Sequence, residues 1–285
     1  MKTILVPTDF SKNADNALKF AIGLAKEEKA KILLLNAWEI TYPATEIPIT
    51  EEIISQQLLS AETNSKKRLD SMILKMKESD IKCDRISIQG HVVEAVLFVI
   101  EKYRVNLVVM GTKGATGLKE IFIGSNTARV IQKVNCPLIA VPHGAVFNGL
   151  KKITFATNYK TEDIRALKKV VKIARLFKAD ITLLHVADEY YTKGEAEILL
   201  KIFADKVAKK LQFSQLTYKL IYGKNIEKKL DDYVKQKHAD LFVMSTLHPN
   251  LFDRLFGGTL IKTMAYHTKM PLMVFQHPDH SIIFL

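Results

Sequence analysis

Apolar residues recur along this chain in two patterns: short unbroken runs, and longer stretches with an apolar residue at every third or fourth position. In the first half short apolar-rich stretches predict strands at 2–7, 31–37, 85–89, 106–110 and 137–141, and those at 106–110 and 137–141 are the unbroken runs. The longer stretches predict helices near 11–28, 51–78, 91–103 and 124–134. Unbroken apolar strands are typical of a parallel sheet covered on both faces. The alternation of strand and helix therefore predicts a doubly wound α/β sheet.

The same pattern occurs twice along the chain. The run at 4–10 returns at 153–159, and the run at 136–141 returns at 270–275. The period of about 140 residues matches the size of a domain and exceeds that of a solenoid repeat. We therefore predict a tandem duplication, with one domain at 1–145 and a second at 150–280.

A glycine pattern follows one of the predicted strands. Gly111 and Gly114 come directly after the run at 106–110, and Gly124 and Ser125 follow after nine further residues. Glycines at a strand exit let the backbone approach a ligand closely, and a helix start offers unpaired N–H groups and the positive end of a helix dipole. The spacing predicts a phosphate-binding loop. It is not a Walker A motif, because no Gly-Lys-Ser/Thr ends it.

Composition narrows the class of protein. With 48% hydrophobic and 25% charged residues the chain is typical of a globular protein, and no run reaches the ~20 apolar residues of a membrane span. Asp9 falls where a secretory signal would still be apolar, so we expect a cytoplasmic protein. The net charge is +12, but the lysines lack interleaved aromatic residues, so nucleic acid is not an expected partner. Cys83 and Cys136 have neither the number nor the spacing of a disulfide framework or a metal site.

Five features, in this order, resemble the universal stress protein family in its tandem two-domain form. They are Val-Pro-Thr-Asp ending at Asp9, Gly90, Asn-Leu-Val-Val-Met-Gly ending at Gly111, Gly-x2-Gly-x9-Gly-Ser ending at Ser125, and Cys-Pro-Leu-Ile-Ala-Val-Pro ending at Pro142. The resemblance covers nearly the whole chain. It implies a Rossmann-like fold of the adenine nucleotide alpha hydrolase type, with a five-stranded parallel sheet in order 3-2-1-4-5 in each copy. It also implies ATP binding, with Mg²⁺ or Mn²⁺ accompanying the nucleotide.

The same resemblance assigns the adenine and ribose side of the site to strand ends. Pro7, Thr8 and Asp9 end the first strand, and Asp9 would contact the ribose or the adenine. The backbone of Ala37, at the end of the second strand, would read the adenine edge, and Met110 is also assigned to the nucleotide site. Two local roles stay open: Asp9 could belong only to the N-cap region of the next helix, and Thr8 could bond only its own backbone.

The phosphate side is assigned to the glycine pattern. Gly111 and Gly114 would make room for the ribose and phosphates, and Gly124, Ser125 and Asn126 would donate N–H and hydroxyl groups to the β- and γ-phosphates. The alternatives are an ordinary turn at the two glycines and an ordinary helix start at Ser125.

The second copy departs from the pattern where binding needs it. Asn158 stands in place of Asp9, and Ser245 in place of Gly111. His248 replaces Gly114 and is followed by Pro249, although Gly258-Thr259 survives. A Cβ, an imidazole and a missing backbone donor should close the cleft. We therefore predict one ATP site, in the first half.

The second copy is then expected to act as a structural partner of the first. Many members of the family that the chain resembles associate through their last strands, and a tandem chain can make this contact within itself. The predicted adjacent edges of this pseudo-dimer are Pro137 to Val141 and Pro271 to Phe275. Further pairing of two chains into a homodimer is left open.

The leading functional hypothesis is a nucleotide-dependent regulatory or stress-response protein in which ATP changes affinity for a protein partner. The alternatives are a slow ATPase, and a ligand-binding or scaffold protein whose second half holds another small molecule. No general base, arginine finger or Walker-type lysine is recognisable for phosphoryl transfer, so no catalytic residue and no protein metal ligand is assigned.

Overall fold

The structure of the chain is a computed structural model that describes residues 2–40, 50–76, 79–112, 125–187, 192–236, 239–246 and 270–276. Several positions singled out in the sequence lie outside these described residues: Gly114 and Gly124 in the first half, and His248, Pro249, Gly258 and Thr259 in the second.

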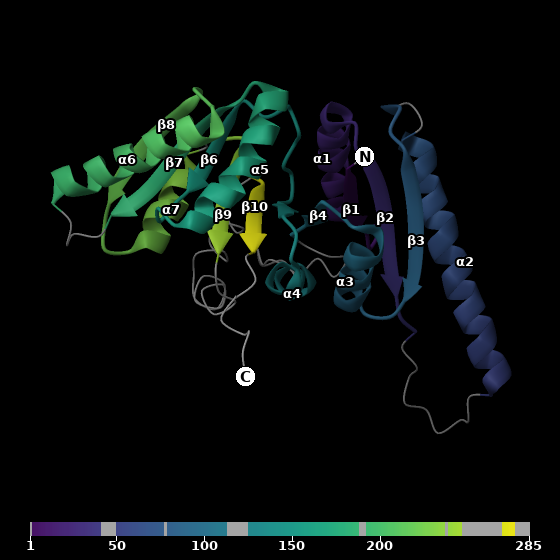
Figure 1. The fold of residues 1–285 in the computed structure, drawn as a ribbon. Helices are drawn as coiled ribbons and strands as arrows, with labels where there is room; N and C mark the ends of the chain where they lie inside the picture. Colours follow the sequence, from purple (N-terminus) through teal and green to yellow (C-terminus); the bar gives the residue numbers. More distant parts are fainter. Residues whose placement is uncertain are drawn as a thin grey trace, which may run out of the picture.

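Strand and helix alternate in both halves, as predicted (Figure 1). The first half contains β1 (Thr3–Pro7), α1 (Lys12–Glu28), β2 (Lys31–Trp38), α2 (Glu51–Met76), β3 (Cys83–Gln89), α3 (Val92–Tyr103), β4 (Leu107–Gly111), α4 (Ser125–Lys133) and β5 (Leu138–Val141). The second contains β6 (Lys152–Ala156), α5 (Thr161–Phe177), β7 (Asp180–Ala187), α6 (Lys193–Leu211), β8 (Leu216–Tyr222), α7 (Ile226–Lys235), β9 (Leu241–Thr246) and β10 (Leu272–Gln276).

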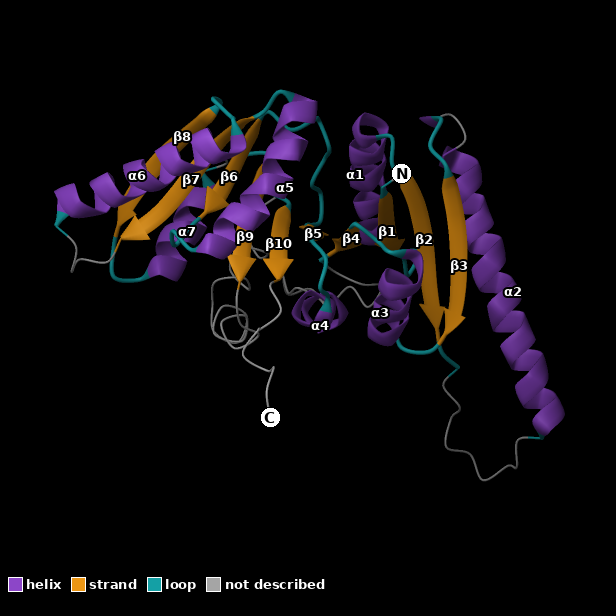
Figure 2. Ribbon diagram, viewed as in Figure 1, coloured by secondary structure: helices purple, strands orange, loops and turns teal. Residues whose placement is uncertain are grey.

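All ten strands join one sheet in the order β3-β2-β1-β4-β5-β10-β9-β6-β7-β8. Each half has the expected order 3-2-1-4-5 and is parallel within itself, as the strand arrows of Figure 2 illustrate. The halves meet where β5 and β10 pair antiparallel, with Ile139 opposite Met273. The predicted pairing of the last strands within the chain is therefore confirmed.

Helices cover both faces of the sheet, because the side chains of each strand alternate between two apolar layers. Ile4 and Val6 of β1 belong to a layer with α1, α2, α5 and α6, whereas Leu5 belongs to the opposite layer with α3, α4 and α7. Parallel strands buried on both faces explain why the sequence shows unbroken apolar runs.

A segment between the halves is held by aromatic rings. Phe147 lies between Phe20 of α1 and Phe177 of α5, at ring-centroid distances of 4.9 and 5.8 Å. Gly23 makes room for it, because a Cβ on Gly23 would lie 2.1 Å from the Phe147 ring. The connection thus packs against both halves at once. Within the described residues, no helix combines the length and apolar character needed to cross a membrane.

Candidate functional site

Three strand ends and two helix starts meet at one rim of the first half. β2, β1 and β4 are parallel neighbours, so their carboxyl ends lie at the same edge of the sheet. The helices α1 and α4 begin at this edge, and the Thr127 hydroxyl in the first turn of α4 donates to the Gly111 carbonyl at 2.8 Å. The described site residues that this brings together are Pro7, Thr8, Asp9, Ala37, Met110, Gly111, Ser125 and Asn126.

The turn after β1 is built from local hydrogen bonds. Thr8 is buried, its N–H donates to the Leu35 carbonyl at 2.8 Å, and its hydroxyl accepts from the N–H of Phe10 at 2.9 Å. Phe10 has a φ of +64°, so the chain reverses sharply here. The local role left open for Thr8 is therefore present.

Asp9 lies exposed at the tip of this turn. Its Oδ1 accepts from the N–H of Ser11 at 3.0 Å, and the Ser11 hydroxyl caps α1 by accepting from the N–H of Ala14 at 3.2 Å. Asp9 therefore supports the start of α1 while its carboxylate faces solvent at the rim. A carboxylate in this position can accept the hydroxyl hydrogens of a ribose.

The backbone of Ala37 faces the space beyond the end of β1. The backbone N–H and C=O groups of every second β2 residue point to β3. Trp38 is one of these residues, because its carbonyl accepts from the N–H of Gly90 at 2.9 Å. Those in between point to β1, where the last ladder pair is Pro7 with Leu35. Ala37 belongs to the second set and lies beyond that pair. Its N–H and C=O are therefore directed at the rim, where a donor and an acceptor side by side can read a base edge.

Gly111 is required by close packing. A Cβ at this position would lie 2.8 Å from the backbone oxygen of Asn13 in the first turn of α1. Ser125 and Asn126, at the start of α4, are exposed. The first N–H groups of a helix have no partner within the helix, so they are available to an anion at this end. The N-terminus of α4 therefore lies beside the end of β4, where Gly111 packs closely against α1.

Two histidines near the rim have polar partners that the sequence did not reveal. Nδ1 of His91 lies 2.5 Å from the Glu39 carboxylate, and Nδ1 of His143 lies 2.6 Å from Oδ1 of Asn13. Glu39 follows β2 and His91 precedes α3, so the neighbouring strands β2 and β3 bring them together. Among the described residues, no group of three or more His, Cys, Asp or Glu is arranged to hold a metal ion.

A cavity of about 620 Å³ opens beside the exit of β2. It is lined by Glu39, Ile40, Ile53, Gln56, Gln57 and Ser60. A second cavity, of about 630 Å³, lies at the opposite edge of the sheet, where the loops before β4 and β5 meet Lys169 of α5. Of these two cavities, the first adjoins the candidate site.

The second half repeats the backbone of the turn with different side chains. The N–H of Thr157 donates to Leu184 at 2.9 Å, its hydroxyl accepts from the N–H of Tyr159 at 3.0 Å, and Tyr159 also has a φ of +64°. The carboxylate here belongs to Asp163, which is buried. Its Oδ2 accepts from the Thr157 hydroxyl at 2.8 Å and from the N–H of Asn158 at 3.1 Å. In the second half the carboxylate therefore stabilises the turn from within the fold and is not exposed at the rim.

His185 takes the place that Asn36 has in the first half. Nδ1 of His185 lies 2.8 Å from the Thr157 carbonyl, as the Asn36 amide nitrogen lies 2.8 Å from that of Thr8. The ring packs on Tyr159 at a centroid distance of 4.4 Å. Burial lowers the pKa of His185, and the hydrogen bond to Thr157 opposes this in part. This position is filled by a neutral aromatic ring at neutral pH.

The comparisons with known proteins agree on the family. The model of the universal stress protein family matches twice, over residues 1–142 and 149–276. A universal stress protein of Methanocaldococcus jannaschii is 32% identical over 142 residues, which are 49% of this chain and 81% of that protein. One of Thermus aquaticus is 31% identical over 140 residues, 49% of this chain and 98% of that protein. The crystal structure of a universal stress protein from Archaeoglobus fulgidus has a TM-score of 0.76 and is 17% identical, with 97% of each chain covered, which supports the fold.

Proposed function

The chain belongs to the universal stress protein family, and from that premise we propose that it binds ATP at the rim of its first half and acts as a nucleotide-dependent regulatory factor in a stress response. The observation that carries the proposal is the backbone of Ala37, directed beyond the last β1–β2 pair and beside the exposed Asp9. A base and a ribose fit this pair of groups, and the phosphates fit the start of α4.

The adenine would be held by the peptide groups of Ala37, with the ribose at Asp9. Adenine presents an amino donor where guanine presents a carbonyl acceptor, so fixed backbone groups can distinguish the two bases. Ser125 and Asn126 would donate to the phosphates, and Mg²⁺ or Mn²⁺ would be held mainly by the phosphate oxygens. Gly114 and Gly124 complete this assignment on the sequence pattern.

The second half would bind no ATP. Asn158 offers no carboxylate at the tip of its turn, and Asp163, the nearby carboxylate, is buried with its oxygen engaged by the turn. Ser245 adds a Cβ where the first half has Gly111. The second half instead supplies β10 as the partner of β5.

ATP would act as a bound switch and not as a substrate. Asp9, the Ser125 hydroxyl and the backbone donors of the described rim suit binding, and the nearby imidazoles of His91 and His143 are engaged with Glu39 and Asn13. Phosphoryl transfer needs a positioned base and cations on the transferred group. If ATP binds one arrangement of the rim more tightly than another, it shifts the population toward that arrangement. The affinity for a protein partner that recognises this arrangement would then rise, by no more than the difference between the two ATP affinities allows. Slow hydrolysis is the alternative.

Calorimetric titration of the full chain with MgATP tests the proposal. We expect one ATP per chain, and loss of binding in Asp9→Asn and in Gly114→Ala. The matched control is Asn158→Ala, which changes the corresponding position of the second half and should leave binding intact. Two ATP per chain, or wild-type binding in Asp9→Asn, would contradict the one-site assignment. Single-turnover hydrolysis faster in the wild type than in Gly114→Ala would favour the ATPase.

A further inference from the structure

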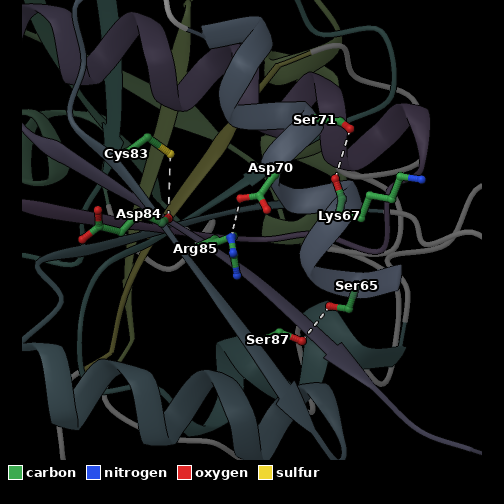
Figure 3. Close-up of polar contacts among 8 residues, drawn as sticks. All are labelled: Ser65, Lys67, Asp70, Ser71, Cys83, Asp84, Arg85 and Ser87. Carbon is green, nitrogen blue, oxygen red and sulfur yellow. Dashed lines mark hydrogen bonds and ion pairs between the residues drawn. The ribbon is translucent and has the colours of Figure 1, made fainter. Parts of the chain in front are cut away.

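A row of hydrogen bonds joins α2 and β3 to the turn that carries Asp9. The Trp38 indole N–H donates to the Ser87 hydroxyl at 2.9 Å, and Ser87 donates to the Ser65 hydroxyl at 2.7 Å. Ser65 donates to Oδ1 of Asn36 at 2.8 Å, and the Asn36 amide donates to the Thr8 carbonyl at 2.8 Å. We call the four side chains Asn36, Trp38, Ser65 and Ser87 the serine network. Figure 3 shows its central step, the contact between Ser65 and Ser87.

All the hydrogen bonds of the serine network run in one direction. Each serine hydroxyl accepts one hydrogen bond and donates the next, so each bond polarises its neighbour. The Asn36 side chain accepts at its amide oxygen and donates from its amide nitrogen. Asn36 and Ser65 are buried, at 6% and 4% exposure. A buried amide has little choice of rotamer when both of its ends are engaged. The network therefore fixes the geometry at its end, which is the Thr8 carbonyl.

Both neighbours of Ala37 in the sequence belong to the serine network. Asn36 and Trp38 are its neighbours along β2, and both side chains point to the face covered by α2, while Ala37 points to the other face. Both residues beside Ala37 are thus tied to side chains of α2 or β3. The peptide groups of Ala37, which are directed at the rim, are held from both sides.

The second half shows that the fold does not need this arrangement. The ladder pair Asn36–Ser87 corresponds to His185–Leu220, and Trp38 corresponds to Ala187. Leu200 is fully buried at the same distance from the end of α6 as Ser65 is from the end of α2. Apolar side chains thus replace three of the four members where no nucleotide is expected. The difference points to binding, because the same strands and helix pack without it.

We propose that the serine network positions the backbone of Ala37 and the Thr8–Asp9 turn for adenosine, and so sets the preference for adenine over guanine. Asn36, Trp38, Ser65 and Ser87 are positioning residues. The inference rests on the proposed ATP site. Loosening the network lets the Ala37 peptide groups shift, and a small shift weakens paired hydrogen bonds to one base edge more than it weakens contacts to phosphates.

The test is equilibrium binding of MgATP and MgGTP to the full chain and to variants of the network. Ser65→Ala and Ser87→Ala should each weaken ATP binding about tenfold and GTP binding less, so that the ratio of the two affinities falls. Ser87→Thr keeps the hydroxyl on a strand position and should restore the wild-type ratio.

Two neighbouring side chains in Figure 3 give matched controls. Ser71 lies on the same helix, but its hydroxyl donates to the Lys67 carbonyl of its own helix, so Ser71→Ala should leave both affinities unchanged. Asp70 forms an ion pair with Arg85 and also joins α2 to β3. Asp70→Asn weakens this contact and should leave the ATP to GTP ratio unchanged.

The outcomes separate the two proposals. A wild-type protein that binds no ATP overturns the proposed function and this inference with it. A wild-type protein that binds ATP, together with an unchanged ratio in Ser65→Ala and Ser87→Ala, overturns the inference alone. The inference is also overturned if Asp70→Asn lowers the ATP to GTP affinity ratio as much as Ser65→Ala and Ser87→Ala do. The effect would then come from the packing of α2 on the sheet. Thermal unfolding of each variant confirms that the compared proteins are folded.

Discussion

The two halves of this chain use one backbone turn for two purposes. Thr8 and Thr157 each donate their N–H to a carbonyl of the neighbouring strand, and their hydroxyls each accept from the N–H two residues on. Phe10 and Tyr159 share a φ of +64°. In the first half the carboxylate at the turn is exposed at the rim, whereas in the second Asp163 carries it inside. The comparison teaches that the turn is a property of the fold. The carboxylate is exposed to solvent in the first half and buried in the second, and the proposed ATP site uses the exposed one.

The largest expected effect comes from removing the buried charge. Asp163→Ala leaves the Thr157 hydroxyl and the N–H groups of Asn158 and Lys160 without their acceptor, so the free energy of unfolding should fall by about 3 kcal/mol. Asp9→Ala should cost less than about 1 kcal/mol, because the carboxylate is exposed and makes one local bond. Urea denaturation of both variants measures this contrast.

ATP binding should show the reverse order. Asp163→Ala should retain the wild-type affinity, and Asp9→Ala should lose it. If Asp163→Ala and Asp9→Ala lowered the free energy of unfolding equally, the proposed difference between a carboxylate that stabilises the fold and one that binds ligand would be wrong.

The connection between the halves offers the next test. Phe147 is half-buried between Phe20 and Phe177, so Phe147→Ala should lower the free energy of unfolding by about 2 kcal/mol. We expect the variant to keep one ATP per chain, because the candidate site residues lie within the first half. Calorimetry combined with urea denaturation checks both statements. Loss of ATP binding in a folded Phe147→Ala would mean that the site depends on both halves.

The exits of β4 and β9 provide a smaller difference. In Gly111→Ala the added methyl would meet the backbone oxygen of Asn13, which should cost about 1–2 kcal/mol and weaken ATP binding, because α1 must move away from the rim. Ser245→Gly in the second half should cost no more than about 1 kcal/mol. Titration and thermal unfolding test the pair. Gain of a second ATP in Ser245→Gly would show that this one Cβ closes the second cleft.

The strands and their burial on both faces could be predicted from the sequence because their cause is local, whereas the strand order was expected from the resemblance to the family. Unbroken apolar runs such as 106–110 require burial on both faces, and the duplicated pattern repeats that requirement in the second half. The strand predicted at 85–89 begins earlier, at Cys83, because Ile32 and Leu33 of β2 provide ladder partners for Cys83 and Asp84. A polar sequence can extend a strand where its neighbour is already in place.

The candidate site was only partly readable from the sequence. Asp9 and Gly111 stand at strand exits, where a motif can identify them. Ser65 and Asn36 are ordinary polar residues until α2 packs on β2, and nothing in their spacing indicates the hydrogen bond between them. Asp163 was missed for a similar reason: an acidic residue in the first turn of a helix is common, and only the structure shows that it accepts from the preceding turn. Roles created by contacts between elements are invisible to a pattern along the chain.

The smallest expected effect is a difference in pH dependence between the halves, since His185 titrates and Asn36 does not. Burial lowers the pKa of His185 in the folded state, so the unfolded chain binds more protons at mildly acidic pH. The stabilising contribution is complete above the ordinary histidine pKa of 6.5 and is lost as the pH falls toward the lowered value. His185→Asn should keep the hydrogen bond to the Thr157 carbonyl and remove this part of the pH dependence. On acidification from neutral to mildly acidic pH, the urea midpoint of the wild type should therefore fall more than that of His185→Asn. Parallel curves would assign the pH dependence to other groups.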